Sequence, residues 1–394
     1  MAHTDVFFVG TSRTAIGSFG GSLKDIPLAD LAIAAVKGAL THAGIDGRHV
    51  SHVVMGNVIA TDPRDAYLSR VAAMGAGIPK ETPAFNVNRL CGSGLQAIVS
   101  AAQGIMLGDY GVAVAGGAES MSRGPYIMPS MRWGSRLGDG QALDYMNGIL
   151  HDPWKKTHMG VTAENIAERY GITREMQDEL ALESQRRAAH AIAEGRFKSQ
   201  IVAVEVRSKK TFVPFDMDEN VRPDIDYEKL ARMQPVFKQG GTVTAGNASS
   251  LNDGAAALVL AEASAIKQHN LQPLARLVAY AHAGVDPDYM GIGPVPATRQ
   301  ALKRAGLSIQ DIDVIESNEA FAAQACAVAR ELDFDPAKVN PNGSGISLGH
   351  PVGATGAIIT IKAIHELHRT GGRYALVTMC IGGGQGIAAI LERV

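Results

Sequence analysis

The chain has 394 residues, which is more than one ordinary hydrophobic core requires, so two or three domains are expected. Hydrophobic residues make up 46% of it, aromatic residues only 5%, and it has 44 glycines; this composition is typical of a tightly turned α/β protein. A net charge of −2 argues against broad binding to nucleic acid or to a membrane surface, and no apolar stretch is expected to span a membrane. The N-terminal residues lack the features of a signal or transit peptide, and an odd cysteine count favours a reducing compartment, so a cytoplasmic location is expected.

Helices and strands are predicted to alternate along both ends of the chain. Short apolar runs predict buried strands, and longer amphipathic runs predict the helices between them. The expected strands are 5–10, 53–58, 84–87, 112–115, 255–260, 314–317 and 375–379, and the expected helices are 28–43, 92–107, 173–196, 297–305, 319–332 and 353–368.

The two ends of the chain show an internal duplication. Three collinear pairs of segments carry the similarity: 39–45 with 301–307, Asn57 with Asn318, and 108–112 with 372–376. Coincidence between similar helix–turn–strand units is the alternative, but three matches in one order favour a true repeat. Two similar α/β halves are therefore expected to face each other, with a ligand site between them.

The middle of the chain has no counterpart in the repeat. Residues 121–154 are rich in Gly, Pro, Met and Arg, and the helix at 173–196 has Thr173 as its expected N-cap. We therefore predict an inserted loop domain at 120–249 that covers the active site. The first half then comprises 1–119 with 250–271, and the second half comprises 272–394.

Cys91 lies just before an expected helix in a glycine-rich setting. A thiol at a helix N-terminus experiences the positive end of the helix dipole, which favours the thiolate form. Gly92 and Gly94 allow a sharp turn and a close approach of ligand to backbone. The position indicates a nucleophile, and a buried structural cysteine is the alternative.

His350 and Cys380 lie in two further glycine-rich segments. His350 precedes the expected helix 353–368, where an imidazole with a pKa near the working pH is suited to deprotonating a thiol. Cys380 is expected just after a strand and before Gly382–Gly384, whose backbone N–H groups are suited to an oxyanion hole. A capping or core histidine and a bystander cysteine are the structural alternatives. Cys326, inside an alanine-rich helix, is predicted to be structural.

Two other polar residues have more than one interpretation. Asn318, which follows a predicted strand, is suited to orienting a water or stabilising an oxyanion, or else to capping the next helix. Ser347 lies in a Gly-x-Ser-x-Gly run that matches the nucleophile elbow of serine hydrolases, but no aspartate follows it. No metal-binding motif in the sequence is complete, so no metal is expected.

Six ordered segments resemble the thiolase family, and together they cover essentially the whole chain. They are Cys91–Ala97, Ala115–Met121, Thr244–Ser249, Asn318–Ala322, Gly349–Gly356 and Cys380–Gly386. The resemblance implies an α/β protein with the duplicated five-layer α-β-α-β-α fold of thiolases and an inserted loop domain. Within the family, the chain is most similar to bacterial biosynthetic acetyl-CoA acetyltransferases and β-ketothiolases, including those that feed polyhydroxyalkanoate synthesis.

The resemblance implies a two-stage reaction on acyl-CoA. Cys91 is acylated with His350 as base, and Cys380 then removes the α-proton of acetyl-CoA, whose carbanion attacks the acyl-enzyme to give a 3-ketoacyl-CoA. One oxyanion hole is assigned to the backbone N–H groups of Cys91 and Gly382, and the other to His350 with a water held by Asn318.

Coenzyme A is implied as a substrate, with no tightly bound cofactor. The family positions that line its path and the pocket wall are His158, Met159, Arg222, Phe237, Ala245, Ser249, Met290, Ala320 and Phe321. The resemblance also implies a homotetramer built as a dimer of dimers, with Ser122–Gln141 as the tetramer contact. A degradative 3-ketoacyl-CoA thiolase, a serine hydrolase and a non-catalytic CoA-binding protein are the alternative functions.

Overall fold

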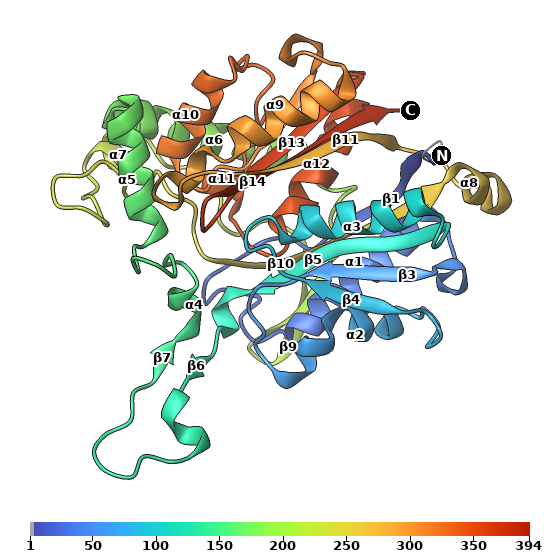
Figure 1. Ribbon diagram of the computed structural model, residues 1–394, viewed down its shortest axis with the longest axis horizontal. Coiled ribbons are helices and arrows are strands. Elements are labelled where there is room, and N and C mark those ends of the chain that lie inside the picture. Colours follow the sequence, from blue (N-terminus) through green and yellow to red (C-terminus); the bar gives the residue numbers. More distant parts are fainter. Residues whose placement is uncertain (1–3) are drawn as a thin grey trace.

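A ten-stranded mixed sheet runs through the structure, a computed structural model that describes residues 4–394 (Figure 1). The first three residues, which the sequence analysis assigns to the first half, lie outside the described residues. The strand order is β12-β13-β14-β11-β1-β10-β5-β3-β4, with β2 paired to β10. The strands are β1 (Val6–Arg13), β2 (Gly17–Ser18), β3 (His52–Gly56), β4 (Ala84–Val87), β5 (Val112–Ser120), β10 (Asn252–Glu262), β11 (Ala275–Gly284), β12 (Val314–Ser317), β13 (Tyr374–Ile381) and β14 (Gln385–Arg393).

The sheet confirms the duplication. Outward from its centre, β1-β10-β5-β3-β4 is matched by β11-β14-β13-β12, and a parallel bridge between Ile315 and Val339 occupies the place of β4. In both halves the inner pairs are antiparallel and the outer pairs are parallel. The halves join where β1 pairs with β11 over Phe7 and Phe8.

Helices cover the two halves in five layers. One hydrophobic core lies between the first half-sheet and the outer helices α1 (Leu28–Ala43) and α2 (Leu68–Gly75), and another lies beneath α9 (Pro294–Ala305) and α10 (Ala322–Glu331) on the second half-sheet. Between the half-sheets, the largest core surrounds α3 (Ser93–Leu107) and α12 (Thr355–Thr370). Figure 1 shows these two helices in the middle of the molecule. The five-layer fold is therefore confirmed.

The N-terminal ends of α3 and α12 touch through glycines. A Cβ atom on Gly94 would lie 2.8 Å from the backbone nitrogen of Ala357, and one on Gly356 would overlap the backbone nitrogen of Leu95. Since neither helix has room for a side chain at these positions, the backbones approach each other directly. This contact fixes where the residues just ahead of the two helices lie.

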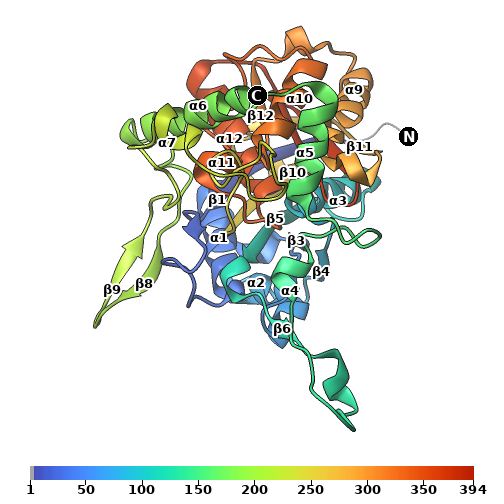
Figure 2. The ribbon, with the colours of Figure 1, turned by 90° about the vertical axis from the view of Figure 1, so that its left-hand side faces the viewer.

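The segment between β5 and β10 forms its own set of small elements. Its helices are α4 (Tyr145–Gly148), α5 (Met159–Tyr170), α6 (Arg174–Ala193) and α7 (Tyr227–Ala231), and its hairpins are β6 (Tyr126–Ile127) with β7 (Leu143–Asp144) and β8 (Val204–Ser208) with β9 (Thr211–Phe215). Thr173 caps α6 as predicted, because its hydroxyl accepts a hydrogen bond from the Met176 N–H. Both hairpins project from the body of the molecule (Figure 2).

Several predicted boundaries were wrong, and some elements were missed. The helix expected from 319 begins at Ala322 as α10, and Cys380 lies inside β13 rather than after it. The missed elements include β11, β14, α2 and α5, together with the short helices α8 (Ala263–His269) and α11 (Gly345–Leu348). The strands β11 and β14 are rich in alanine, and short apolar runs of such residues do not by periodicity alone separate strand from helix.

The expectation that no stretch has membrane-spanning length was also wrong. Residues Leu90–Leu107 are long and apolar enough by length and composition. They include α3, and 67% of this window is buried inside the protein. Their apolar character is explained by the central layer, where α3 has the core on nearly every side.

Replacing Gly356 by alanine is expected to lower stability by about 1–3 kcal/mol, because the new methyl group meets backbone that cannot move aside. The thermal unfolding midpoint, followed by circular dichroism, measures the loss. The control is Gly148→Ala in α4, where a Cβ meets no described atom within 4 Å. A Gly356→Ala protein that melts with the wild type would show that the helix contact is not tight.

Candidate active site

Cys91 lies on a tight turn between β4 and α3. Leu90 has a left-handed backbone (φ 46°), and the side chain of Asn88 accepts a hydrogen bond from its N–H at 2.9 Å. The Ser93 hydroxyl accepts from the Arg89 N–H (2.9 Å) and donates to the Leu90 carbonyl (2.6 Å). These hydrogen bonds stabilise the left-handed backbone of Leu90 and hold Cys91 at the tip of the turn.

Burial, rather than the helix dipole, dominates the charge state of Cys91. Burial raises the pKa of its thiol, and the charge of Glu119 acts in the same direction. Hydrogen bonds from the backbone N–H groups of Gly382 and of Cys91 itself lower the pKa but do not offset burial. The expectation that the helix N-terminus favours the thiolate was therefore wrong for the resting protein. A base is needed to remove the proton.

His350 is the candidate for this base, and its tautomer follows from its neighbours. The Thr355 hydroxyl donates to the Pro351 carbonyl at 2.9 Å, so it accepts from Nδ1–H of His350 at 2.7 Å. The other ring nitrogen, Nε2, is then unprotonated, and it faces the amide nitrogen of Asn318 at 3.4 Å. The backbone N–H of His350 is held by the Asn252 side chain at 2.8 Å.

Burial lowers the pKa of His350 to about 4. A pKa near the working pH was expected for His350, and this was wrong because the imidazole is almost completely enclosed. The consequence is a ring that is neutral at neutral pH, which is the form that accepts a proton.

Cys380 lies beside Cys91, near the end of β13. It is buried, and the hairpin that follows it turns through Gly383 and Gly384, both with positive φ (81° and 84°). Burial raises the pKa of its thiol, and the charge of Cys91 raises it further. A charged Cys91 therefore makes ionisation of Cys380 harder, which requires that the two sulfur atoms lie near each other.

Glu119 is a site residue that the sequence analysis missed. Its carboxylate accepts from the Asn57 side chain (2.9 Å), from the Ile59 N–H (3.0 Å) and from the Gly353 N–H (2.9 Å) in the loop after His350. Burial raises the pKa of Glu119 to about 8. The repeat contained a signal for it, because Asn57, whose side chain donates to Glu119, is the counterpart of the candidate residue Asn318. Glu119 joins the loop after β3 to the loop that carries His350.

Most residues predicted to contact coenzyme A gather next to Cys380. The hydrophobic cluster that contains Cys380 includes five of the predicted residues: Met159, Phe237, Met290, Ala320 and Phe321. His158 stacks on the Phe237 ring at 4.6 Å between centroids, and its Nδ1 accepts from the Gly160 N–H at the start of α5. Burial lowers the pKa of His158 to about 4, so it faces this cluster as a neutral ring.

The other three predicted contacts lie further out. The Ser249 N–H donates to the Ala320 carbonyl at 3.0 Å, which places this half-buried residue at the margin of the cluster. Ala245 is exposed in the preceding turn. Arg222 is exposed as well, and its backbone N–H is held by Gln185 of α6. The structure does not bring Arg222 into the Cys380 cluster.

The structure argues against the serine-hydrolase alternative. Ser347 is fully buried in α11, and its hydroxyl is bonded to Ser184 (2.8 Å) and to the Ser344 carbonyl (3.3 Å). Cys326 of α10 contacts the Met176 carbonyl. Within residues 4–394, no group of three His, Cys, Asp or Glu side chains is arranged to hold a metal ion.

A half-buried thiol, a buried thiol and a neutral histidine, between duplicated half-sheets, form a candidate thiol-dependent acyl-transfer site of the thiolase type. The family models for the thiolase N-terminal and C-terminal domains match residues 6–264 and 271–393. The chain therefore belongs to the thiolase family and is an acyltransferase.

Individual relatives agree over the full length. The chain is 63% identical to the "Beta-ketothiolase BktB" of Cupriavidus necator, covering 99% of each chain, and 49% identical to an acetyl-CoA acetyltransferase of Pseudomonas aeruginosa, again over 99% of each. The crystal structure of human mitochondrial 3-ketoacyl-CoA thiolase superposes with a TM-score of 0.98 at 47% identity, covering 99% of each chain. The same human enzyme in complex with CoA matches with a TM-score of 0.96 at 47% identity, over 99% of this chain and 98% of that one.

The buried neutral His350 predicts an acid-dependent loss of stability. Its folded pKa of about 4 lies below the ordinary value of 6.5, so the unfolded chain binds the extra proton first and stability falls as the pH drops from 6.5 towards 4. The difference between these two pKa values corresponds to a change of about 3 kcal/mol in the free energy of unfolding from this one group. Urea unfolding of wild type and His350→Gln at several pH values measures it, and the stability difference between the two should shrink by that amount between pH 7 and pH 4. A constant difference would contradict the buried neutral ring.

Proposed function

We propose that the chain catalyses the reversible Claisen condensation of acetyl-CoA with acetyl-CoA or another short acyl-CoA, giving a 3-ketoacyl-CoA and free CoA. One observation carries the proposal: the turn that holds Cys91 packs directly on the end of the strand that holds Cys380, since a Cβ atom on Gly92 would lie 2.5 Å from the Ile381 side chain and one on Gly382 would lie 3.5 Å from that of Leu90. The raised pKa of Cys380, to which Cys91 contributes, agrees with two sulfur atoms in one site. The condensation needs a nucleophile that is also a good leaving group, and a separate base that removes a proton from carbon. Two thiols in one site can supply these two roles.

In the first half-reaction, Nε2 of His350 takes the Cys91 proton and the thiolate attacks the acyl-CoA carbonyl. The C–S bond to CoA breaks, and the departing thiolate takes the proton back from His350 and leaves as CoASH. The developing oxyanion is stabilised by the two N–H groups that already point at the Cys91 sulfur, those of Gly382 and of Cys91 itself.

In the second half-reaction, Nε2 of the neutral His350 takes the proton of the Cys380 thiol, and the resulting thiolate takes the α-proton of acetyl-CoA. The carbanion attacks the acyl group, the bond to Cys91 breaks, and the departing Cys91 thiolate takes the proton from His350, so both thiols and the neutral imidazole are restored. Once Cys91 is acylated, it no longer carries the charge that raises the pKa of Cys380. The first step thereby eases ionisation of the second thiol. His350 and a water held by Asn318 stabilise the second oxyanion, consistent with the contact between the two side chains.

Coenzyme A is proposed to approach along the insertion, past His158 and Ser249, with Met290 and Phe321 as pocket wall and no tightly bound cofactor. The 63% identity to a β-ketothiolase supports a biosynthetic role with short acyl chains, including supply to polyhydroxyalkanoate synthesis. The human relative is named a 3-ketoacyl-CoA thiolase, and degradative thiolysis by the same residues in reverse is the second candidate. A cytoplasmic location suits either direction.

We further propose that the chain is organised as a first half of residues 1–119 with 250–271, an inserted loop domain of residues 120–249, and a second half of residues 272–394. The pairing of β10 with both β1 and β5 supports the return of the chain to the first half after the insertion.

Assembly as a homotetramer is proposed to use the segment Ser122–Gln141. This segment projects from the body in both views (Figures 1 and 2), and its apolar side chains are unusually exposed, with Trp133 at 93% and Leu137 at 96%. Large exposed apolar groups on one projecting loop are characteristic of a contact with another subunit.

Acetyl-CoA alone is expected to acetylate Cys91. Acid quenching followed by peptide mass spectrometry should find the acetyl group on the peptide that contains Cys91 and not on the one that contains Cys380. Cys380→Ser should still be acetylated but should form acetoacetyl-CoA at least 10²-fold more slowly, because the base at carbon is missing.

Cys91→Ser is the matched control, expected to bind CoA while giving no acyl-enzyme. If both variants lost acetylation equally, the division of labour between the thiols would be wrong. CoA binding by the wild type without any acyl-cysteine would point to a non-catalytic CoA-binding protein.

Trp133→Asp combined with Leu137→Asp is expected to convert the tetramer into dimers, because a charge at the centre of an apolar contact is costly to bury. Size-exclusion chromatography with light scattering measures the mass. Phe212→Asp, at the exposed tip of the β8–β9 hairpin (70% exposed), is the control and should leave the mass unchanged. An unchanged mass for the double variant would exclude this segment as the contact.

A further inference from the structure

A small cavity is lined in part by Asn318. Its volume is about 10 Å³, which is close to the space one water molecule needs. Asn318, Gly345 and Lys362 line it together with Ser344, Thr355 and several apolar side chains. The hydroxyls of Ser344 and Thr355 already have hydrogen-bond partners, so Asn318 and Lys362 are the polar groups to consider.

The first polar group on its wall is the amide oxygen of Asn318. Asn318 is fully buried, and within the described chain its Oδ1 atom has no hydrogen-bond partner. A Cβ atom on Gly345 would lie 2.8 Å from this oxygen. Because Gly345 also lines the cavity, the unpaired oxygen lies at the cavity wall. A buried acceptor without a donor costs about 1–3 kcal/mol, so such an atom normally has a partner.

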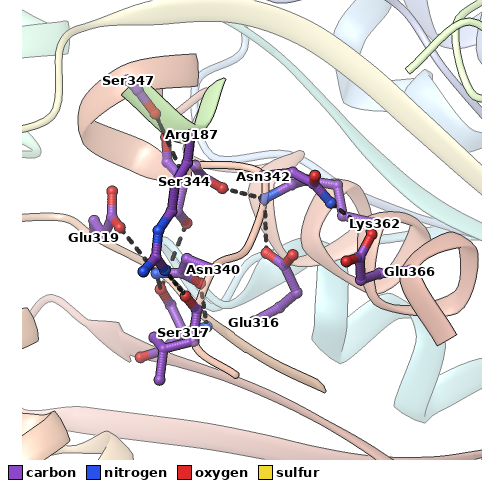
Figure 3. Close-up of polar contacts among 12 residues, drawn as sticks. Arg187, Glu316, Ser317, Glu319, Asn340, Asn342, Ser344, Ser347, Lys362 and Glu366 are labelled. Atoms are coloured by element: carbon purple, nitrogen blue, oxygen red, sulfur yellow. Dashed lines mark hydrogen bonds and ion pairs between the residues drawn. The ribbon is translucent and has the colours of Figure 1, made fainter. Parts of the chain in front are cut away.

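The second polar group is the ammonium of Lys362, which belongs to the polar network drawn in Figure 3. Lys362 and Glu316 are 1% and 0% exposed and form an ion pair at 2.7 Å. The ammonium donates to Glu316 and to the Gly343 carbonyl. An ammonium has three N–H groups, so these two bonds leave one for the cavity.

We propose that one water molecule occupies this cavity and joins Lys362 to Asn318. The water accepts the third N–H of Lys362 and donates one of its own protons to Oδ1 of Asn318. A cavity of one-water size with a spare donor and an unpaired acceptor on its walls satisfies both groups at once.

The water site makes Lys362 a positioning residue for the reaction, an inference that rests on the proposed function of Asn318. The unprotonated Nε2 of His350 needs a donor opposite it, so Asn318 must present its amide nitrogen. A rotated amide would set Oδ1 against Nε2, with two acceptors facing each other. The Lys362-bound water holds Oδ1 on the far side and so fixes the productive orientation.

A high-resolution crystal structure of the wild-type enzyme tests the site itself. The expected result is one density peak within hydrogen-bond distance of both Lys362 Nζ and Asn318 Oδ1. An empty cavity, or an occupant that does not contact Oδ1, would overturn the proposal. The presence of this density does not depend on enzyme activity, so the water site can be tested even if the proposed thiolase reaction is wrong.

Kinetics tests the positioning role. The double variant Glu316→Gln/Lys362→Met removes the ammonium without leaving a buried charge unpaired. It should lower kcat for condensation about tenfold, the size of one lost hydrogen bond, while KM for acetyl-CoA changes little. The matched control Glu316→Gln keeps the Lys362 amine as a donor to the water, whether charged or neutral, and should retain kcat within about twofold although its thermal midpoint falls, because the buried amine loses its carboxylate partner.

The two variants separate positioning from general stability. Thermal midpoints of both report how far each is destabilised. Equal loss of kcat in both variants, or a loss confined to KM, would show that the ion pair serves only packing and would refute the positioning role.

Discussion

The close approach of α3 and α12 in the central layer is the constraint on which the rest of the site depends. Each helix offers a glycine at its first turn, and the backbones meet there without side chains between them. Cys91 lies just ahead of one helix and His350 just ahead of the other, so the contact brings the reacting groups from the two halves together. The duplicated fold thus supplies two similar helix starts, and the sequence assigns a different chemical group to each.

Burial governs the charge of every reacting group in this site. It raises the pKa of both thiols and lowers that of His350, so the resting site is largely uncharged. An enclosed site of this kind makes each hydrogen bond to a developing charge stronger, because no water competes for it. The N–H groups of Gly382 and Cys91 then stabilise the site most when negative charge develops on the oxygen of the reacting carbonyl group. Because a charged Cys91 raises the pKa of Cys380, acylation of Cys91 before Cys380 ionises is favoured.

The inserted loop domain is attached to both halves by buried polar contacts. Arg13 of β1 forms a fully buried ion pair with Asp218 at 2.7 Å, and the Asn220 side chain donates to the Ser347 carbonyl. Ser250, at the end of the insertion, donates to Asn252, whose side chain holds the His350 backbone. The segment proposed to bind coenzyme A is therefore continuous, through short hydrogen bonds, with the loop that carries the proposed base.

The sequence alone determined the fold class, the duplication, the family and the identity of Cys91, His350, Cys380 and Asn318 as candidates, since glycine-flanked reactive residues and a collinear repeat are local patterns. Only the tertiary structure decided how these groups are charged, because burial depends on what other segments cover them; the dipole argument for Cys91 and the near-neutral pKa expected for His350 both failed for this reason. Glu119 was missed although its partner Asn57 belongs to the repeat, and Lys362 had no signal in the sequence. A lone lysine in an apolar run has no sequence signature, and the roles of both residues come from partners such as Gly353 or Glu316 that the fold places beside them.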